Sequence, residues 1–464
     1  MMKKYILQWL ILPLLLASCG TLPPLPTATS TPTFTPAPPT ATLAPSVTPA
    51  PTLTLTPTVT IWPTPNPDQI AVLERLRMVY VRGLVNGSLY VQDGTNPPKQ
   101  LTHGDQDREP SISDDGEKII FYRGKPYEIN EVYSIDADGS HEQPLITNNI
   151  LAALNLNYTD KTEVRDLTLV PGTHQVLFST QEFPGDRKAY GMTPVRDLLL
   201  ADIDTGKIRR ILAPGEVEGF LVSPDGKLVA IQTSDQVKVI DLAGRVVHSA
   251  LVTYTYPIDY YPIYFSWTQD SSTLFALPPR VWNGNIYENV PPNTIWKCPV
   301  RSGSPVEIQL IPPPLSDIYA ISPDGKWIVY TYAHVGFLDE ADLAIPRGIY
   351  LGNLQDGSTK LLAGEPKAGQ YFQWSPDNSH FIFTRTSRSQ NLAVLGDVVT
   401  GELTQLKDIR DFIGWIDANH YLFGNAEMGV VDLETTFNVA EFAGVSASYP
   451  GTFAFVLLKT PTEK

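Results

Sequence analysis

From residue 78 onward, apolar positions come in short runs broken by polar turns, a pattern that predicts β-strands. One run ends at Ser223-Pro-Asp-Gly-Lys227, and a second apolar run, 228–231, follows directly. Proline presets φ at the first turn position and glycine accepts the positive φ that such a turn needs. The two runs therefore predict a β-hairpin. No stretch keeps a 3.6-residue period, so we expect few helices.

This hairpin pattern recurs along the chain. Clear copies are Ser322-Pro-Asp-Gly-Lys326 and Ser375-Pro-Asp-Asn-Ser379. Weaker copies are centred on residues 114, 171, 268 and 416. The spacing of 40 to 57 residues is typical of a solenoid or a propeller. Each hairpin is followed by a third run, a second polar turn and a short fourth run, so each unit predicts one four-stranded antiparallel blade.

The number of blades depends on how the ends of the chain are used. Residues 78–82, 88–92 and 99–102 predict three strands that lack a first strand before them. The apolar run 452–459 can supply it, which would pair the two ends and remove open sheet edges. We therefore predict an all-β, seven- or eight-bladed β-propeller. The count is eight unless the weak unit at 411–442 merges with the closing blade.

Composition separates the propeller, residues 68–464, from what precedes it. Residues 21–67 contain 14 Pro and 15 Thr among 47 positions and carry no charge. Such a segment cannot bury a core, so we expect a disordered Pro/Thr-rich tether over residues 19–67. Pro with Thr is also typical of O-glycosylated stalks, and the sequence leaves open whether sugar is attached.

The first 18 residues have the pattern of an export signal. Lys3 and Lys4 precede the mostly apolar run 5–17, which at 13 residues is too short to span a bilayer as a helix. Leu16-Ala-Ser-Cys19 ends this run and resembles the lipobox of bacterial lipoproteins. The resemblance implies that the Cys19 thiol carries a diacylglycerol, with acyl chains such as palmitate, and becomes the new N-terminus. We therefore expect an extracytoplasmic protein held on the cell membrane or outer envelope through Cys19.

The repeats carry a second resemblance. Ser-Pro-Asp-Gly-Lys with an apolar run after it, followed by an Asp-x-Asp-Gly-Ser type turn, is similar to the WD40-like β-propeller repeat of TolB-type proteins. The same repeat occurs in the propeller domains of prolyl oligopeptidases. The resemblance covers residues 78–459 and implies a propeller with a binding role, without naming the ligand.

Charge and chemistry-bearing residues narrow the function. A formal net charge of −15 disfavours binding to nucleic acid. The only other cysteine, Cys298, lies in a strand-like run and is expected to be a packed thiol. The seven histidines are scattered, and no nucleophile elbow, zinc or phosphate-binding motif occurs. We expect no cofactor and no metal site, interpret the Asp136-Ala-Asp-Gly139 turn as structural, and expect that the protein is not an enzyme.

Loop length suggests where a partner would bind. In an antiparallel blade the turns between strands 1 and 2 and between strands 3 and 4 share one end, and the other connections share the opposite end. The long insertions, 148–163, 181–195, 253–262, 278–293 and 333–346, all belong to the opposite end. Long loops on a rigid scaffold commonly carry binding residues. The candidate binding residues there are Tyr190, Tyr256, Tyr260, Tyr261, Trp282, Tyr287 and His334.

Two functional hypotheses remain. The first is a monomeric, membrane-anchored binding scaffold for a protein, peptide or glycan. The alternative is an envelope hydrolase or lyase whose acid and base residues converge in the propeller funnel from different blades, because such a site leaves no local motif.

Overall fold

The fold is taken from a computed structural model of the chain. Residues 61–464 form one compact unit. The structure describes residues 67–82, 87–104, 106–124, 131–154, 156, 158–159, 161–182, 193–253, 264–277, 295–301, 303–310, 319–332, 348–364, 369–386, 391–406, 411–424, 428–433, 438–442 and 453–460. The predicted signal peptide, Cys19 and the predicted tether through residue 66 lie outside them.

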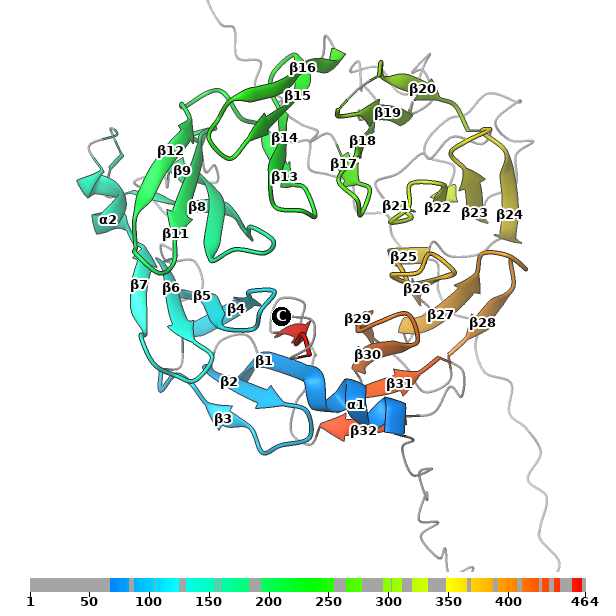
Figure 1. The fold of residues 1–464 in the computed structure, drawn as a ribbon, viewed down its shortest axis with the longest axis horizontal. Helices are drawn as coiled ribbons and strands as arrows, with labels where there is room; N and C mark the ends of the chain where they lie inside the picture. The colour runs from blue at the N-terminus through cyan, green and yellow to red at the C-terminus, as the bar shows by residue number, and fades with distance from the viewer. Residues whose placement is uncertain are drawn as a thin grey trace, which may run out of the picture. The chain divides into compact units, whose positions relative to one another are not determined.

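Residues 67–460 form eight antiparallel sheets, the blades of a propeller, arranged in a ring (Figure 1). Blade 1 contains β33 (Phe453–Leu457), β1 (Leu76–Arg82), β2 (Ser88–Asp93) and β3 (Lys99–Gln100). Blade 2 contains β4 (Asp107–Ile112), β5 (Lys118–Arg123), β6 (Glu131–Asp136) and β7 (Gln143–Ile146). Blade 3 contains β8 (Thr162–Leu169), β9 (Gln175–Glu182), β11 (Leu198–Asp202) and β12 (Ile208–Leu212), with β10 (Thr193–Pro194) paired to β9. Blade 4 contains β13 (Gly219–Val222), β14 (Leu228–Gln232), β15 (Gln236–Asp241) and β16 (Val246–Thr253).

The second half of the ring repeats this plan. Blade 5 contains β17 (Tyr264–Trp267), β18 (Thr273–Leu277), β19 (Ile295–Pro299) and β20 (Val306–Ile308). Blade 6 contains β21 (Tyr319–Ile321), β22 (Trp327–Tyr332), β23 (Gly348–Asn353) and β24 (Thr359–Gly364). Blade 7 contains β25 (Gly369–Trp374), β26 (His380–Thr386), β27 (Asn391–Asp397) and β28 (Leu403–Gln405). Blade 8 contains β29 (Asp411–Trp415), β30 (His420–Gly424), β31 (Met428–Asp432) and β32 (Asn438–Phe442).

The ring closes through the two ends of the propeller, as the sequence predicts. β33 pairs with β1, with Leu76 opposite Leu457 and Tyr80 opposite Phe453. Residues 411–442 form a blade of their own, so the count is eight and the seven-blade alternative is excluded. The closing blade also packs on blade 8, because Met78 and Tyr80 share a buried cluster with Leu422 and Val430.

Apolar side chains fill every junction between neighbouring blades. The eight buried clusters each combine residues of two adjacent blades, as in Ala230 and Val237 of blade 4 with Leu274 and Cys298 of blade 5. Cys298 is fully buried, which confirms the packed thiol, and burial raises its pKa to about 12. Burial of apolar surface between blades is therefore what holds the ring together.

Three tryptophans add a polar link between inner strands. The indole nitrogen of Trp374 in blade 7 donates to the carbonyl of Ala320 in blade 6 at 2.9 Å. Trp267 and Trp415 make the same bond to Leu221 and Gln373 of the blades before them, at 3.2 and 3.4 Å. Each tryptophan stands directly before the turn of its blade, so the repeat itself places the donor.

The predicted hairpins are formed as expected. Gly226 and Gly325 both have φ of 68°. The Ser322 hydroxyl donates to Asp324 Oδ1 at 2.6 Å, and this carboxylate oxygen also accepts from the backbone N–H of Lys326. Since the same serine-to-aspartate bond recurs in the other hairpins that carry this pair, the aspartate of the repeat is first of all a turn residue.

Helices are few in the described part of the chain. α1 (Pro67–Arg75) leads into β1, and α2 (Asn148–Ala153) lies between blades 2 and 3. Among the residues searched, no helix has the length and apolar character that crossing a bilayer requires. By strand order, residues 183–192, 278–294 and 333–347 connect strands 2 and 3 of their blades, and 254–263 connect blades 4 and 5.

Candidate functional site

The innermost strands of blades 2, 3 and 7 share a β-bulge. In β4 the pairing jumps between Arg108 and Ser111, so that two residues lie opposite one residue of β5. β8 makes the same jump between Val164 and Leu167, and β25 makes it between Gln370 and Gln373. A bulge changes the direction of the side chains that it carries, and bulges are over-represented next to active sites.

The bulges place exposed polar or aromatic side chains at one repeat position. Glu109, Asp166 and Tyr371 each lie four residues before the first residue of the hairpin turn in their blade. The side chains of Glu109 and Asp166 are 56% and 51% exposed, and Tyr371 is 73% exposed. These strands are the innermost strands of their blades and line the inside of the ring (Figure 1).

Two of these residues have backbone angles that side chains rarely adopt. φ is 50° at Glu109 and 57° at Tyr371. A bulky residue in this region costs free energy, and such strain persists only where the surrounding structure fixes it. The bulge therefore holds these side chains in place against an unfavourable backbone angle.

The carboxylates of blades 2 and 3 both act on Tyr122 through their charges. Burial raises the pKa of the Tyr122 phenol, and the negative charges of Glu109 and then Asp166 raise it further. Both acids are exposed, and exposed carboxyl groups can exchange protons with a bound molecule.

Neighbouring side chains fix these carboxylates. Arg108 Nε lies 3.7 Å from Glu109 Oε1, and Arg108 also donates to the carbonyl of Gly124 at 2.6 Å. The hydroxyl of Ser179 donates to Asp166 Oδ2 at 3.0 Å, and Arg165 Nε lies 3.3 Å from the same oxygen. Both acids are thus oriented while their outer halves stay accessible.

The residues that the sequence proposed for binding cannot be placed. Tyr190, Tyr256, Tyr260, Tyr261, Trp282, Tyr287 and His334 all lie outside the described residues. Tyr158, an aromatic residue of the 148–163 insertion, is described, and its hydroxyl donates to the buried Asp197 of blade 3. The Arg210 guanidinium lies over its ring at 5.4 Å. Tyr158 therefore anchors its loop on the blade and offers little surface to a partner.

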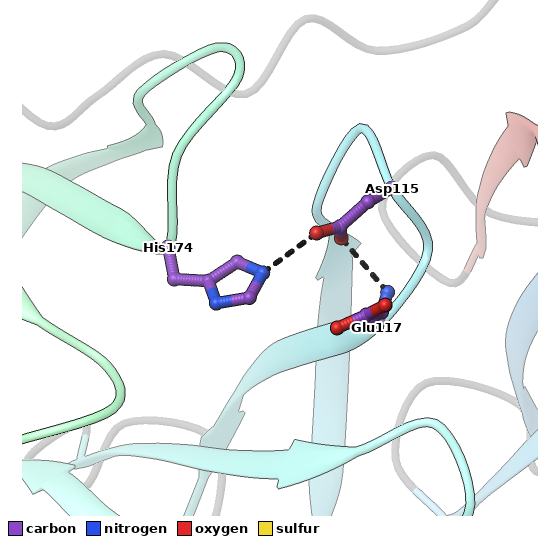
Figure 2. A group of neighbouring side chains, drawn as sticks. All are labelled: Asp115, Glu117 and His174. Atoms are coloured by element: carbon purple, nitrogen blue, oxygen red, sulfur yellow. Dashed lines mark hydrogen bonds and ion pairs between the residues drawn. The ribbon is translucent and has the colours of Figure 1, made fainter. Parts of the chain in front are cut away.

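A second group of titratable side chains lies at the opposite end of the blades, where the hairpin turns are. His174 follows the blade 3 turn, and its Nε2 lies 2.8 Å from Asp115 Oδ2 of the blade 2 hairpin (Figure 2). Its Nδ1 lies 2.9 Å from Asp204 Oδ2. Lys118 Nζ joins Asp204 to Asp136 with contacts of 2.9 and 2.8 Å.

The charged side chains in this group shift one another's pKa values. Partial burial alone would lower the pKa of His174, but the hydrogen bonds to Asp204 and Asp115 outweigh it and raise that pKa. Burial likewise opposes the charged form of Asp115, yet bonds from Ser113, the Glu117 backbone and His174 hold its pKa below the ordinary value. A cation between His174 and Asp115 is thus favoured, and a proton can supply it.

The fold is that of known propellers, although no family model and no curated protein matches the sequence. The structure is similar to dihydro-heme d1 dehydrogenase NirN, with a TM-score of 0.51 and 14% identity over 83% of this chain and 75% of that one. It is also similar to oligogalacturonate lyase from Vibrio parahaemolyticus (TM-score 0.46, 14% identity, 67% and 83% covered). Porphyromonas gingivalis dipeptidyl peptidase 4 is a third match (TM-score 0.49, 11% identity, 79% and 58% covered).

These matches correct one expectation. The absence of a local catalytic motif led to the expectation that the protein is not an enzyme. That expectation is corrected, because the fold is shared with a dehydrogenase at a TM-score of 0.51. Propeller sites are assembled from separate blades, so the lack of a motif excludes nothing. At these identities the similarity shows the fold and does not identify a reaction.

Proposed function

We propose that the protein is an extracytoplasmic hydrolase or lyase, anchored through lipid on Cys19, with its site in the propeller funnel. The observation that carries the proposal is the inner-strand bulges of β4 and β8, which carry the exposed acids Glu109 and Asp166 on adjacent blades. Two half-exposed carboxylates can divide the roles of acid and base.

The two carboxyl groups would divide the proton transfers between them. One carboxyl group donates a proton to the leaving oxygen or nitrogen. In a hydrolase the other carboxylate takes a proton from water, whose oxygen bonds to the carbon as the bond to the leaving group breaks. In a lyase it takes a proton from a carbon next to a carbonyl or carboxylate, and the released electron pair forms a double bond as the adjacent carbon loses the leaving oxygen. β25, the strand that carries Tyr371, lies across the ring from β4 and β8 (Figure 1). The exposed Tyr371 ring would offer an apolar face to a sugar or a side chain.

Glycans and peptides of the envelope are the substrate classes that fit. By strand order the long insertions connect strands 2 and 3 or successive blades, and β4, which carries Glu109, begins at a connection between blades. In this proposal the predicted face, from Tyr190 to His334, binds the chain of the substrate, and the monomeric propeller brings its scissile bond to the two acids.

The test is turnover of a panel of envelope glycans and peptides by the full-length protein and by Glu109→Gln and Asp166→Asn. We expect each substitution to lower kcat by about 10² to 10⁴, because each removes one proton-transfer group. Glu402→Gln, an exposed acid on the outer part of blade 7, serves as the control and should change nothing. Absence of turnover across the panel, or full activity of both variants, would contradict the proposal.

The anchor has a separate test. Cys19→Ala should abolish incorporation of labelled fatty acid and release the protein from membranes, since each buried CH₂ of the lost chains is worth about 0.8 kcal/mol. Normal labelling of this variant would rule out the lipoprotein assignment.

A further inference from the structure

Asp115, Glu117 and His174 bring three metal-binding groups together across the junction of blades 2 and 3. Their ligand atoms all lie within 4.8 Å of one another. Asp115 and Glu117 come from the β4–β5 hairpin, and His174 comes from the neighbouring β8–β9 hairpin (Figure 2). One imidazole with two carboxylates is a ligand set that divalent transition metals accept.

The set differs from the hairpins of blades 4 and 6. In blades 4 and 6 the residue after the turn glycine is Lys227 or Lys326, and each ammonium group pairs with the aspartate of its own turn. The same repeat position is occupied by Glu117 in blade 2 and by His174 in blade 3. Blades 2 and 3 thus carry metal-binding side chains where blades 4 and 6 carry lysine, and Asp115 has no lysine at this position of its own turn.

The Asp115 oxygen that its own turn does not use faces His174. Asp115 Oδ1 is used by its own turn, where it accepts from Ser113 Oγ at 2.6 Å and from the Glu117 N–H at 3.0 Å. Asp115 Oδ2 is left to face His174 Nε2. The Glu117 side chain is exposed and makes no hydrogen bond with the described residues. Both carboxylates can therefore bind a cation without breaking the turn.

The charged side chains around these three residues are compatible with a bound cation. Asp204 accepts from His174 Nδ1 at 2.9 Å, an arrangement that fixes the tautomer and directs Nε2 toward a metal ion. The Lys118 ammonium is already shared by Asp136 and Asp204. Arg77, the other nearby cation, is held by both oxygens of Asp93 at 2.6 and 2.7 Å.

We propose that Asp115, Glu117 and His174 bind one divalent transition-metal ion, Zn²⁺ or Mn²⁺, and that Asp204 positions the imidazole. The ion cross-links blades 2 and 3 at the hairpin end of the ring. This site is distinct from the funnel acids Glu109 and Asp166, and it does not depend on the proposed reaction.

The experiment is calorimetric titration of the chelator-treated, full-length protein with ZnCl₂ and with MnCl₂, together with the melting temperature at each metal concentration. We expect saturable binding of one ion per chain and a rise in melting temperature with metal, because the ion binds the folded state. Asp204→Asn should weaken binding by about 10- to 100-fold, as loss of a supporting partner usually does.

Glu117→Lys and His174→Lys are the informative variants, since each restores the lysine that the repeat carries in blades 4 and 6. Both should fold, because the hairpin accepts lysine at this position, and both should lose the binding and the metal-dependent stabilisation. His380→Gln, which changes a histidine in the hairpin of blade 7, is the matched control and should bind like the parent chain. Absence of binding up to about 1 mM metal, the weak end of known extracellular sites, would overturn the proposal. Undiminished binding by Glu117→Lys or His174→Lys would overturn it as well.

Discussion

The junction between blades 2 and 3 and the junction between blades 6 and 7 use the same hairpin but are linked by different chemistry. In both, serine donates to Oδ1 of the turn aspartate at 2.6 Å, through Ser113 and Asp115 or through Ser322 and Asp324. The second carboxylate oxygen differs. Asp324 Oδ2 pairs with its own Lys326 at 3.0 Å, whereas Asp115 Oδ2 reaches His174 of the next blade.

The inner strands of the two junctions differ in a complementary way. At blades 6 and 7, Trp374 donates to the carbonyl of Ala320. The matching position in blade 3 is Leu169, which packs on the apolar cluster and has no donor to offer. One junction is therefore joined by a neutral hydrogen bond and the other by a set of charges. The repeat fixes the hairpin, and the residues around it decide how two blades are joined.

The largest effect is expected at the glycine that both hairpins require. A Cβ at Gly325 would lie 2.7 Å from Thr268 Cγ2 and 2.9 Å from the buried Phe275 ring, and φ there is +68°. Gly325→Val should lower the free energy of unfolding by about 3 kcal/mol, from left-handed strain together with overpacking. Chemical denaturation measures it. Gly206→Val, with φ of +66° and nothing within 4 Å of its Cβ, should lose only about 1 kcal/mol. Equal losses at the two glycines would show that the hairpin does not press on the neighbouring blade.

Removal of the tryptophan link comes second. Trp374→Phe keeps most of the buried ring but leaves the Ala320 carbonyl without its donor. We expect a loss of about 1 to 2 kcal/mol in unfolding free energy. Because no charge is involved, the loss should be the same in low and high salt. A salt-dependent loss would mean that the two junctions do not differ in the way proposed.

The fold could be predicted from the sequence because the repeat consists of residues that determine local structure. Ser-Pro-Asp-Gly predicts a turn wherever it occurs, and the unpaired run 452–459 predicts the closing strand β33. The funnel acids were missed for the opposite reason. Glu109 and Asp166 lie on separate blades, 57 residues apart in the sequence, and each is carried by a bulge that no local motif announces.

A signal for both candidate sites was nevertheless present in the register of the repeats. Glu109, Asp166 and Tyr371 share one repeat position, and Glu117 and His174 share another, where blades 4 and 6 carry lysine. A comparison of each position across the blades would have singled out these residues. Their distances required the packing of the ring.

A smaller effect should follow from removal of the charged link. In metal-free protein, His174→Gln deletes the imidazole between Asp115 and Asp204 and should lower the free energy of unfolding by about 1 kcal/mol or less, because the pair is partly exposed. The loss should shrink at about 1 M salt, where charges are screened beyond roughly 3 Å. Denaturation curves at two salt concentrations, with Trp374→Phe measured beside it, give the contrast directly. A loss of the same size at both salt concentrations would show that His174 acts by packing.

The smallest effect concerns acid stability at the blade 6 hairpin. Burial opposes ionisation of Asp324, but bonds from Ser322 and Lys326 outweigh it and lower its pKa below the ordinary 3.8. A group with a lowered folded-state pKa stabilises the protein above its unfolded value and loses this contribution as pH falls through the folded value. Asp324→Asn should therefore reduce stability near neutral pH and leave a flatter profile below about pH 4. Melting temperatures from about pH 7 down to pH 3 test this, and Asp356→Asn, in an exposed turn of the same blade, shows how much of the slope comes from surface carboxylates in general. If the stability of Asp324→Asn fell with pH as steeply as that of the parent chain, the Asp324 carboxylate would contribute nothing to the turn that it shares with Lys326.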